Sequence, residues 1–96
     1  MENEAKDKDT KMNFTVFISG LLMEGLAALG IMKHPAAQDI KKDLGHASLV
    51  IDTLSMLEEK TSGNLTDEER DSLGMAIHQL RVGYVAEAEK EKKDEA

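Results

Sequence analysis

The most apolar part of the chain lies near its start. The run from Phe14 to Met32 carries one charge, on Glu24. Its large apolar residues recur at steps of three and four, which is the period of a helix. Asn13, just before the run, is a residue type that caps helix N-termini. The pattern predicts a first helix over residues 13–31.

This helix has two apolar faces, whereas a helix on the surface of a bundle needs only one. The bulkier face is formed by Phe14, Ile18, Leu21, Leu22, Gly25, Leu29 and Met32. The lighter face is formed by Phe17, Gly20, Glu24, Ala27 and Ile31. We expect the bulky face to pack in the core and the lighter face to contact a second copy of the chain.

Two further helices are predicted over residues 43–62 and 66–86. The segment between the first two, 33–43, contains the only proline, Pro35, and is expected to reverse the chain. In the second helix, Leu49 and Met56 fall outside the buried stripe, one heptad apart. A lone bundle would leave both exposed, so we add them to the predicted self-association surface.

The link between the second and third helices carries the clearest local signal. Gly63 and Asn64 are suited to the left-handed backbone conformation that often follows a helix. Thr66 and Glu69 match a capping box, in which each side chain accepts a hydrogen bond from the other residue's amide. We interpret these four residues as a structural turn and cap.

Both ends of the chain are rich in charge. Residues 1–12 and 87–96 are predicted to be charged, disordered tails around a helical domain at 13–86. The fold class that follows is all-α, an up-down-up bundle of three helices completed by homodimerisation through the first helix.

Composition removes several classes of function. The net charge of −7 and the lack of a basic stripe argue against nucleic-acid binding. There is no cysteine, and no His pair has metal-ligand spacing. No catalytic triad or phosphate-binding loop is visible. We therefore predict no catalytic residues, no metal, no cofactor and no enzyme activity. The start of the chain lacks a secretory pattern, so a cytoplasmic location is expected.

The stretch from Ile51 to Thr66, IDTLSMLEEKTSGNLT, resembles the signature of a bacterial family, the domain of unknown function 1844. The acid pair Glu68–Glu69 and the later Leu80–Arg81 and Tyr84 also fit its pattern. The resemblance covers most of residues 14–85. It implies a small helical protein and defines no catalytic residues.

Three hypotheses of function follow. The first is a non-catalytic interaction or scaffold module that forms a homodimer, with another protein partner possible. In it Glu24 lies at the edge of the interface, meeting Lys33, His46 or Arg81, or fixes the register of two copies. The second is a membrane-associated protein that inserts residues 14–32, although Glu24 makes insertion costly. The third is a ligand-binding protein or enzyme that uses Glu24 in a pocket between subunits.

Overall fold

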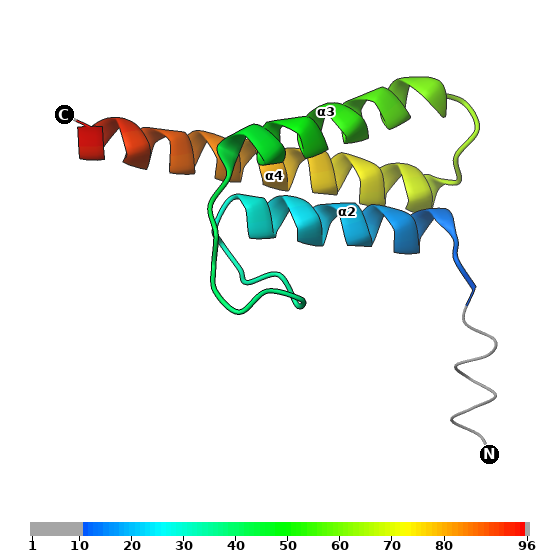
Figure 1. Cartoon of the computed structure of the whole chain (residues 1–96). Coiled ribbons are helices and arrows are strands. Elements are labelled where there is room, and N and C mark those ends of the chain that lie inside the picture. Colours follow the sequence, from blue (N-terminus) through cyan, green and yellow to red (C-terminus); the bar gives the residue numbers. More distant parts are fainter. Residues whose placement is uncertain (1–10, 96) are drawn as a thin grey trace, which may run out of the picture.

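The computed structural model describes residues 11–95, which form three helices and no strand. They are α2 (Phe14–Ala28), α3 (Leu44–Lys60) and α4 (Asp67–Glu95). Each helix packs against both others, and α3 runs opposite to α2 and α4 (Figure 1). The all-α, up-down-up arrangement is confirmed, and dimerisation stays a prediction. The predicted tail at 1–12 lies almost entirely outside the described residues.

The core is a single cluster of apolar side chains from all three helices. Its buried members are Ile18, Ala28, Leu29, Ala47, Val50, Leu54, Leu73, Ala76, Ile77 and Leu80. Burying a Leu or Ile side chain contributes about 1.5–3 kcal/mol. Ile18 and the C-cap Leu29 belong to the bulky face predicted for the first helix, whereas Ala28 does not.

Two glycines let α2 lie close against α4. A Cβ built on Gly25 would sit 2.7 Å from both terminal carbons of Leu80. One built on Gly83 would sit 2.8 Å from Cδ1 of Leu29. Both leucines are fully buried, so a side chain at either glycine has no room. Gly83, which interrupts the helical pattern of the third segment, is therefore explained by close packing.

Helix α2 ends earlier than the predicted residue 31. Leu29 is its C-cap, and Gly30 takes the left-handed conformation, with φ of 79°. The N–H of Gly30 donates to Ala27 O and the N–H of Ile31 donates to Leu26 O. This pair of hydrogen bonds is a Schellman motif, which ends the helix before Ile31.

The turn between α3 and α4 follows the prediction with one correction. Gly63 has φ of 80°, but Asn64 does not take the left-handed conformation, and its N–H donates to Thr61 O. The capping box is formed as expected. Thr66 N–H donates to Glu69 Oε1 at 2.8 Å, and Glu69 N–H donates to Thr66 Oγ1 at 3.1 Å.

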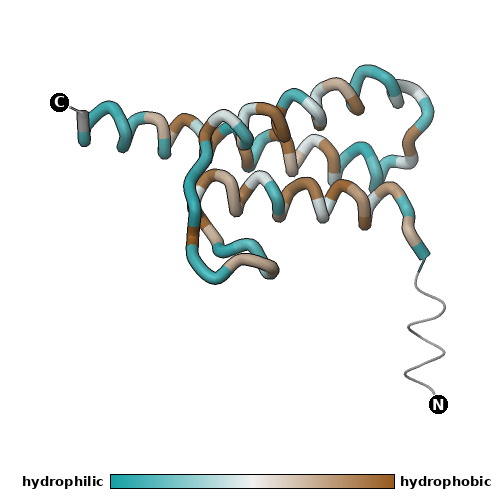
Figure 2. Tube along the Cα trace, in the orientation of Figure 1, coloured by the Kyte–Doolittle hydropathy of each residue, from teal (hydrophilic) through white to brown (hydrophobic). Residues whose placement is uncertain are grey.

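Helix α4 is longer than predicted, since it continues to Glu95 through a segment expected to be a disordered tail. This end of α4 is strongly hydrophilic and extends past the other helices (Figures 1 and 2). The prediction underweighted helix propensity, because Ala, Glu and Lys are all strong helix formers. Ion pairs one turn apart, such as Glu87–Lys90 at 3.1 Å, further stabilise this part of the helix.

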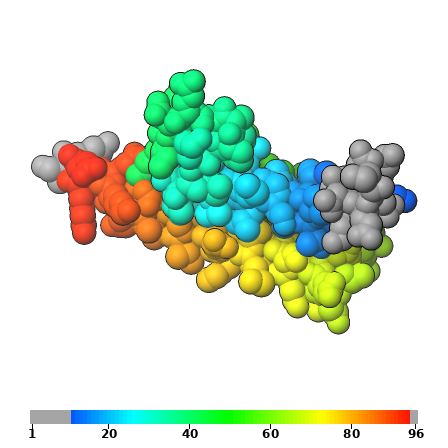
Figure 3. Space-filling model, turned by 90° about the horizontal axis from the view of Figure 1, so that it is seen from below, coloured from blue at the N-terminus to red at the C-terminus, as the bar shows by residue number. Residues whose placement is uncertain are grey.

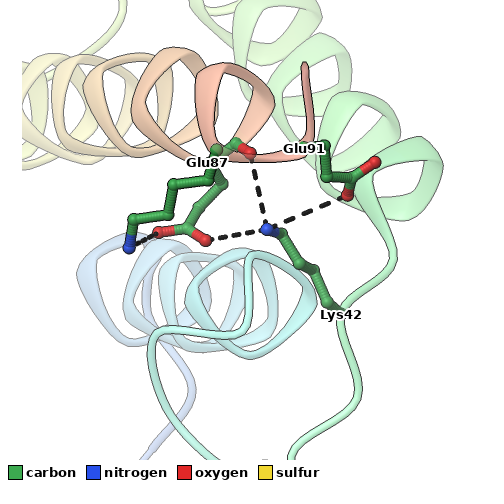
Figure 4. Close-up of polar contacts among 4 residues, drawn as sticks. Lys42, Glu87 and Glu91 are labelled. Atoms are coloured by element: carbon green, nitrogen blue, oxygen red, sulfur yellow. Dashed lines mark hydrogen bonds and ion pairs between the residues drawn. The ribbon is translucent and has the colours of Figure 1, made fainter. Parts of the chain in front are cut away.

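The connection between α2 and α3 contacts the bundle through its last residues, just before α3 begins. Asp43 N–H donates to Ala28 O at 2.7 Å. Lys42 Nζ lies 2.9 Å from Glu87 Oε1 and 3.8 Å from Glu91 Oε2 (Figure 4). Hydrogen bonds from Lys42 and then Lys90 lower the pKa of the Glu87 carboxyl. Lys42 thus links the connection to α4 just beyond the core.

Candidate functional site

The outer face of α2 is the candidate site, and its orientation is set by the start of the helix. Asn13 Oδ1 accepts a hydrogen bond from Val16 N–H at 2.9 Å, which fixes the first turn. Ile18, Gly25 and Ala28 then face the core. On the opposite side, the later part of α2 is seen at the surface between α4 and the connection at 29–43 (Figure 3).

Along this open side, four residues recur at steps of four, three and four: Val16, Gly20, Met23 and Ala27. Val16 and Met23 are each 43% exposed. Nothing lies within 4 Å of a Cβ built on Gly20. The steps are those of a coiled-coil seam, in which one helix packs lengthwise against another. We call these four residues the α2 seam.

Two of the predicted interface residues belong to this seam, and others are exposed elsewhere on α2 and on α3. Phe17 is 44% exposed on the side of α2 that leads towards His46 on α3. Leu49 and Met56 are exposed on α3, as their spacing indicated. Gly20 and Ala27 belong to the seam itself.

Ile31 is 51% exposed, so its place in the interface stays a prediction, but it does not lie on the helical stripe of Phe17. It lies beyond the end of α2, and its Cδ1 is 3.2 Å from a Cβ built on Gly83 of α4. Because the Schellman turn redirects the backbone, Ile31 leaves the helical stripe to which its spacing assigned it.

Two residues of the α2 seam, Val16 and Met23, were not predicted. They lie on the stripe next to the predicted one, which begins at Phe17. The signal was present, since Val16, Gly20, Met23 and Ala27 have the spacing of a seam.

Glu24 is the only charged residue of α2, and of its three predicted partners the structure selects His46. Glu24 Oε2 and His46 Nε2 lie 2.9 Å apart. The Glu24 side chain is 44% exposed and the His46 side chain is 43% exposed. Arg81 instead donates to Ser55 Oγ, and Lys33 donates to Ala37 O. The pair joins α2 to the first turn of α3 beside the seam.

An open pocket of about 360 Å³ adjoins this pair. It is lined by Glu24, Ala27, Ala28, His34, Ala37, Asp39, Lys41, Asp43 and His46. Several polar groups here already have partners in the chain. Asp43 Oδ1 accepts from His46 N–H, and His34 Nδ1 accepts from Ala36 N–H. These contacts shape the connection and the start of α3.

Two features of the described residues bear on the alternative hypotheses. Within residues 11–95, no three His, Asp or Glu side chains gather in a way that could hold a metal ion. None of the three helices described is both long and apolar enough to cross a membrane. Residues 14–32, the segment of the insertion hypothesis, do not form one continuous helix, because α2 ends at Ala28.

The comparisons with known proteins identify a family and nothing closer. No curated protein and no solved structure matches the chain. The sequence model of one family, described as Domain of unknown function (DUF1844), matches residues 11–87, which include α2, α3 and most of α4. The resemblance seen in the turn and cap signature is thus confirmed, and the chain belongs to the DUF1844 family.

Proposed function

We propose that this protein is a non-catalytic helical interaction module whose first partner is a second copy of itself. The observation that carries the proposal is the open apolar face of α2. Val16, Phe17 and Met23 are each more than 40% exposed on one 15-residue helix. Monomeric proteins rarely leave contiguous apolar surface of this kind uncovered.

The size of the domain supports the proposal. A chain of 96 residues buries a smaller share of its surface than a larger domain does, and association with a copy compensates for this. Leu49 and Met56 add exposed apolar surface on α3, at 60% and 45% exposure.

The surroundings of Glu24 support a structural role rather than a reaction. Its carboxylate is hydrogen-bonded to His46, and no side-chain N or O buried within residues 11–95 lacks a partner. A site built for catalysis more often contains a polar group held ready for substrate. The hydrogen bond to His46 instead gives a partner to the one charged side chain that α2 would bring to an interface.

Size-exclusion chromatography with light scattering tests the proposal, and two methionines give a matched pair of variants. We expect a dimer at micromolar concentration. Met23→Glu should weaken it roughly a hundredfold or more, because a buried unpaired carboxylate costs several kcal/mol. Met75→Glu makes the same change on α4, where Met75 is 70% exposed, and should leave the dimer intact. A wild-type protein that is monomeric at these concentrations would refute the proposal.

A further inference from the structure

The order of residue sizes along the α2 seam indicates how two copies would pack. Large and small side chains alternate in it: Val16, Gly20, Met23, Ala27. We propose that α2 pairs with α2 of a second copy in antiparallel orientation, about a two-fold axis level with the midpoint between Gly20 and Met23. This inference rests on the proposed function and specifies its partner and geometry.

The antiparallel order makes the seam complementary to itself. A two-fold axis at that midpoint sets Val16 opposite Ala27 of the partner subunit, and Met23 opposite Gly20 of the partner subunit. Each large side chain then meets a small one, as close packing requires. A parallel pairing in register would instead set Met23 against its own copy and leave a gap between the two Gly20 residues.

The open backbone at Gly20 fits this arrangement. Gly25 and Gly83 are filled by leucines of the chain itself, but a Cβ at Gly20 would meet nothing within 4 Å. A helix-interior glycine costs about 1 kcal/mol relative to alanine. In the proposed dimer, Met23 of the partner subunit occupies the space over Gly20.

Charge favours the same orientation. The net charge of −7 means that two copies can approach closely only through an uncharged surface, and Glu24 is the one charge on α2. A parallel pair would bring the two Glu24 carboxylates level with each other. The antiparallel pair separates them by about 7 Å along the helix axis, since each residue advances 1.5 Å. It also sets the positive end of each helix dipole beside the negative end of the other.

The exposed apolar residues Leu49, Met56 and Met75 have acids close to them along their helices and suit a two-fold contact less well. On α3, Asp52 lies between Leu49 and Met56. On α4, Asp71 is one turn before Met75. A two-fold axis centred on either helix would bring like charges together. The α2 seam, with no acid among its four residues, therefore fits a second copy better than these positions do.

An exchange of residue sizes tests the pairing. Gly20→Leu should raise the dissociation constant of the dimer roughly tenfold or more, because Leu would overlap Met23 of the partner subunit. The open space around Gly20 means that this change should not disturb the fold of one subunit. The double variant Gly20→Leu/Met23→Gly reverses large and small and should recover most of the affinity. A double variant weaker than Gly20→Leu alone would overturn the pairing.

Disulfide trapping reads the orientation directly, since the chain has no cysteine of its own. Mixed Val16→Cys and Ala27→Cys proteins should cross-link to each other on mild oxidation. Val16→Cys alone should not, because its two copies would lie about 16 Å apart along the axis, and a disulfide needs Cα atoms within about 7 Å. Cross-linking of Val16→Cys with itself, or a dimer with no mixed cross-link, would overturn the antiparallel pairing alone. A monomer by light scattering would overturn the proposed function as well.

Discussion

At the scale of single residues, the glycines show how different roles can follow from one residue type. Gly25 and Gly83 are needed because leucines of a neighbouring segment fill the space that a side chain would take. Gly30 and Gly63 are needed for their positive φ. Gly74 has neither constraint, and nothing lies within 4 Å of its built Cβ. The effect of substitution should differ accordingly.

Replacing Gly25 or Gly74 by Ala should change stability in opposite directions. Gly74→Ala should raise the free energy of unfolding by about 0.5–1 kcal/mol, because Ala is the better helix former. Gly25→Ala gains the same propensity but overpacks Leu80, which is fully buried and cannot turn aside, so a net loss of about 1 kcal/mol is expected.

Urea unfolding of both variants and the wild type, at one protein concentration, measures the two effects without interference from self-association. Two variants equally more stable than the wild type would show that Leu80 yields to the added methyl group.

The role of a residue could be predicted from the sequence when its partners lie within one turn of the chain. Thr66 and Glu69 were identified correctly as a cap, because the two residues satisfy each other within one turn. For Glu24, the sequence predicted three possible partners and gave no reason to prefer one of them. The choice of His46 depends on how α2 and α3 lie in space, which helical spacing does not specify.

At the scale of helices, starts were predicted better than ends. Asn13 was predicted as the first N-cap and is confirmed, because side-chain caps have recognisable types. The second helix was predicted to begin at residue 43, and the structure has Asp43 as its N-cap. The end of α2 was placed three residues late, because a Schellman turn is a backbone arrangement. The end of α4 was missed because charged composition suggests disorder, although Glu and Lys also favour helix.

A shortened chain that ends at Ala88 tests the structure of the α4 extension. Every buried core residue lies at or before Leu80, so the melting temperature should stay within a few degrees of that of the full chain. Lys42 keeps its contact with Glu87 in this variant. The molar ellipticity at 222 nm should fall in proportion to the helical residues removed. An unchanged molar ellipticity would show that the segment is not helical in solution.

At the scale of the whole molecule, the arrangement of the helices was easier to predict than the surface proposed for assembly. The order of the helices was predicted correctly, since periodicity and short links leave few ways to pack three helices. The sequence also located an excess of apolar surface on the first helix. The sequence contains the spacing of the α2 seam, but choosing it over the stripe that begins at Phe17 required knowing which side of α2 faces outward.

Because each subunit carries a net charge of −7, the proposed dimer should tighten as salt is added. The seam contains no ion pairs for salt to weaken, so the main electrostatic contribution is repulsion between the two subunits. The screening length falls from about 30 Å at 10 mM to about 8 Å at 150 mM salt. Over that range we expect the dissociation constant, measured by sedimentation equilibrium, to fall several-fold.

A variant with less net charge separates this effect from any general action of salt on apolar surfaces. Glu59 and Glu89 are exposed near the ends of α3 and α4, where Lys also suits the helix dipole. The double variant Glu59→Lys/Glu89→Lys should bind more tightly than the wild type at 10 mM salt, and its affinity should depend less on salt. Equal salt dependence in the two proteins would show that repulsion does not limit the dimer. A wild-type dimer that weakens with salt would instead require ion pairs across the interface, and α2, whose only charge is already paired with His46, could not be its centre.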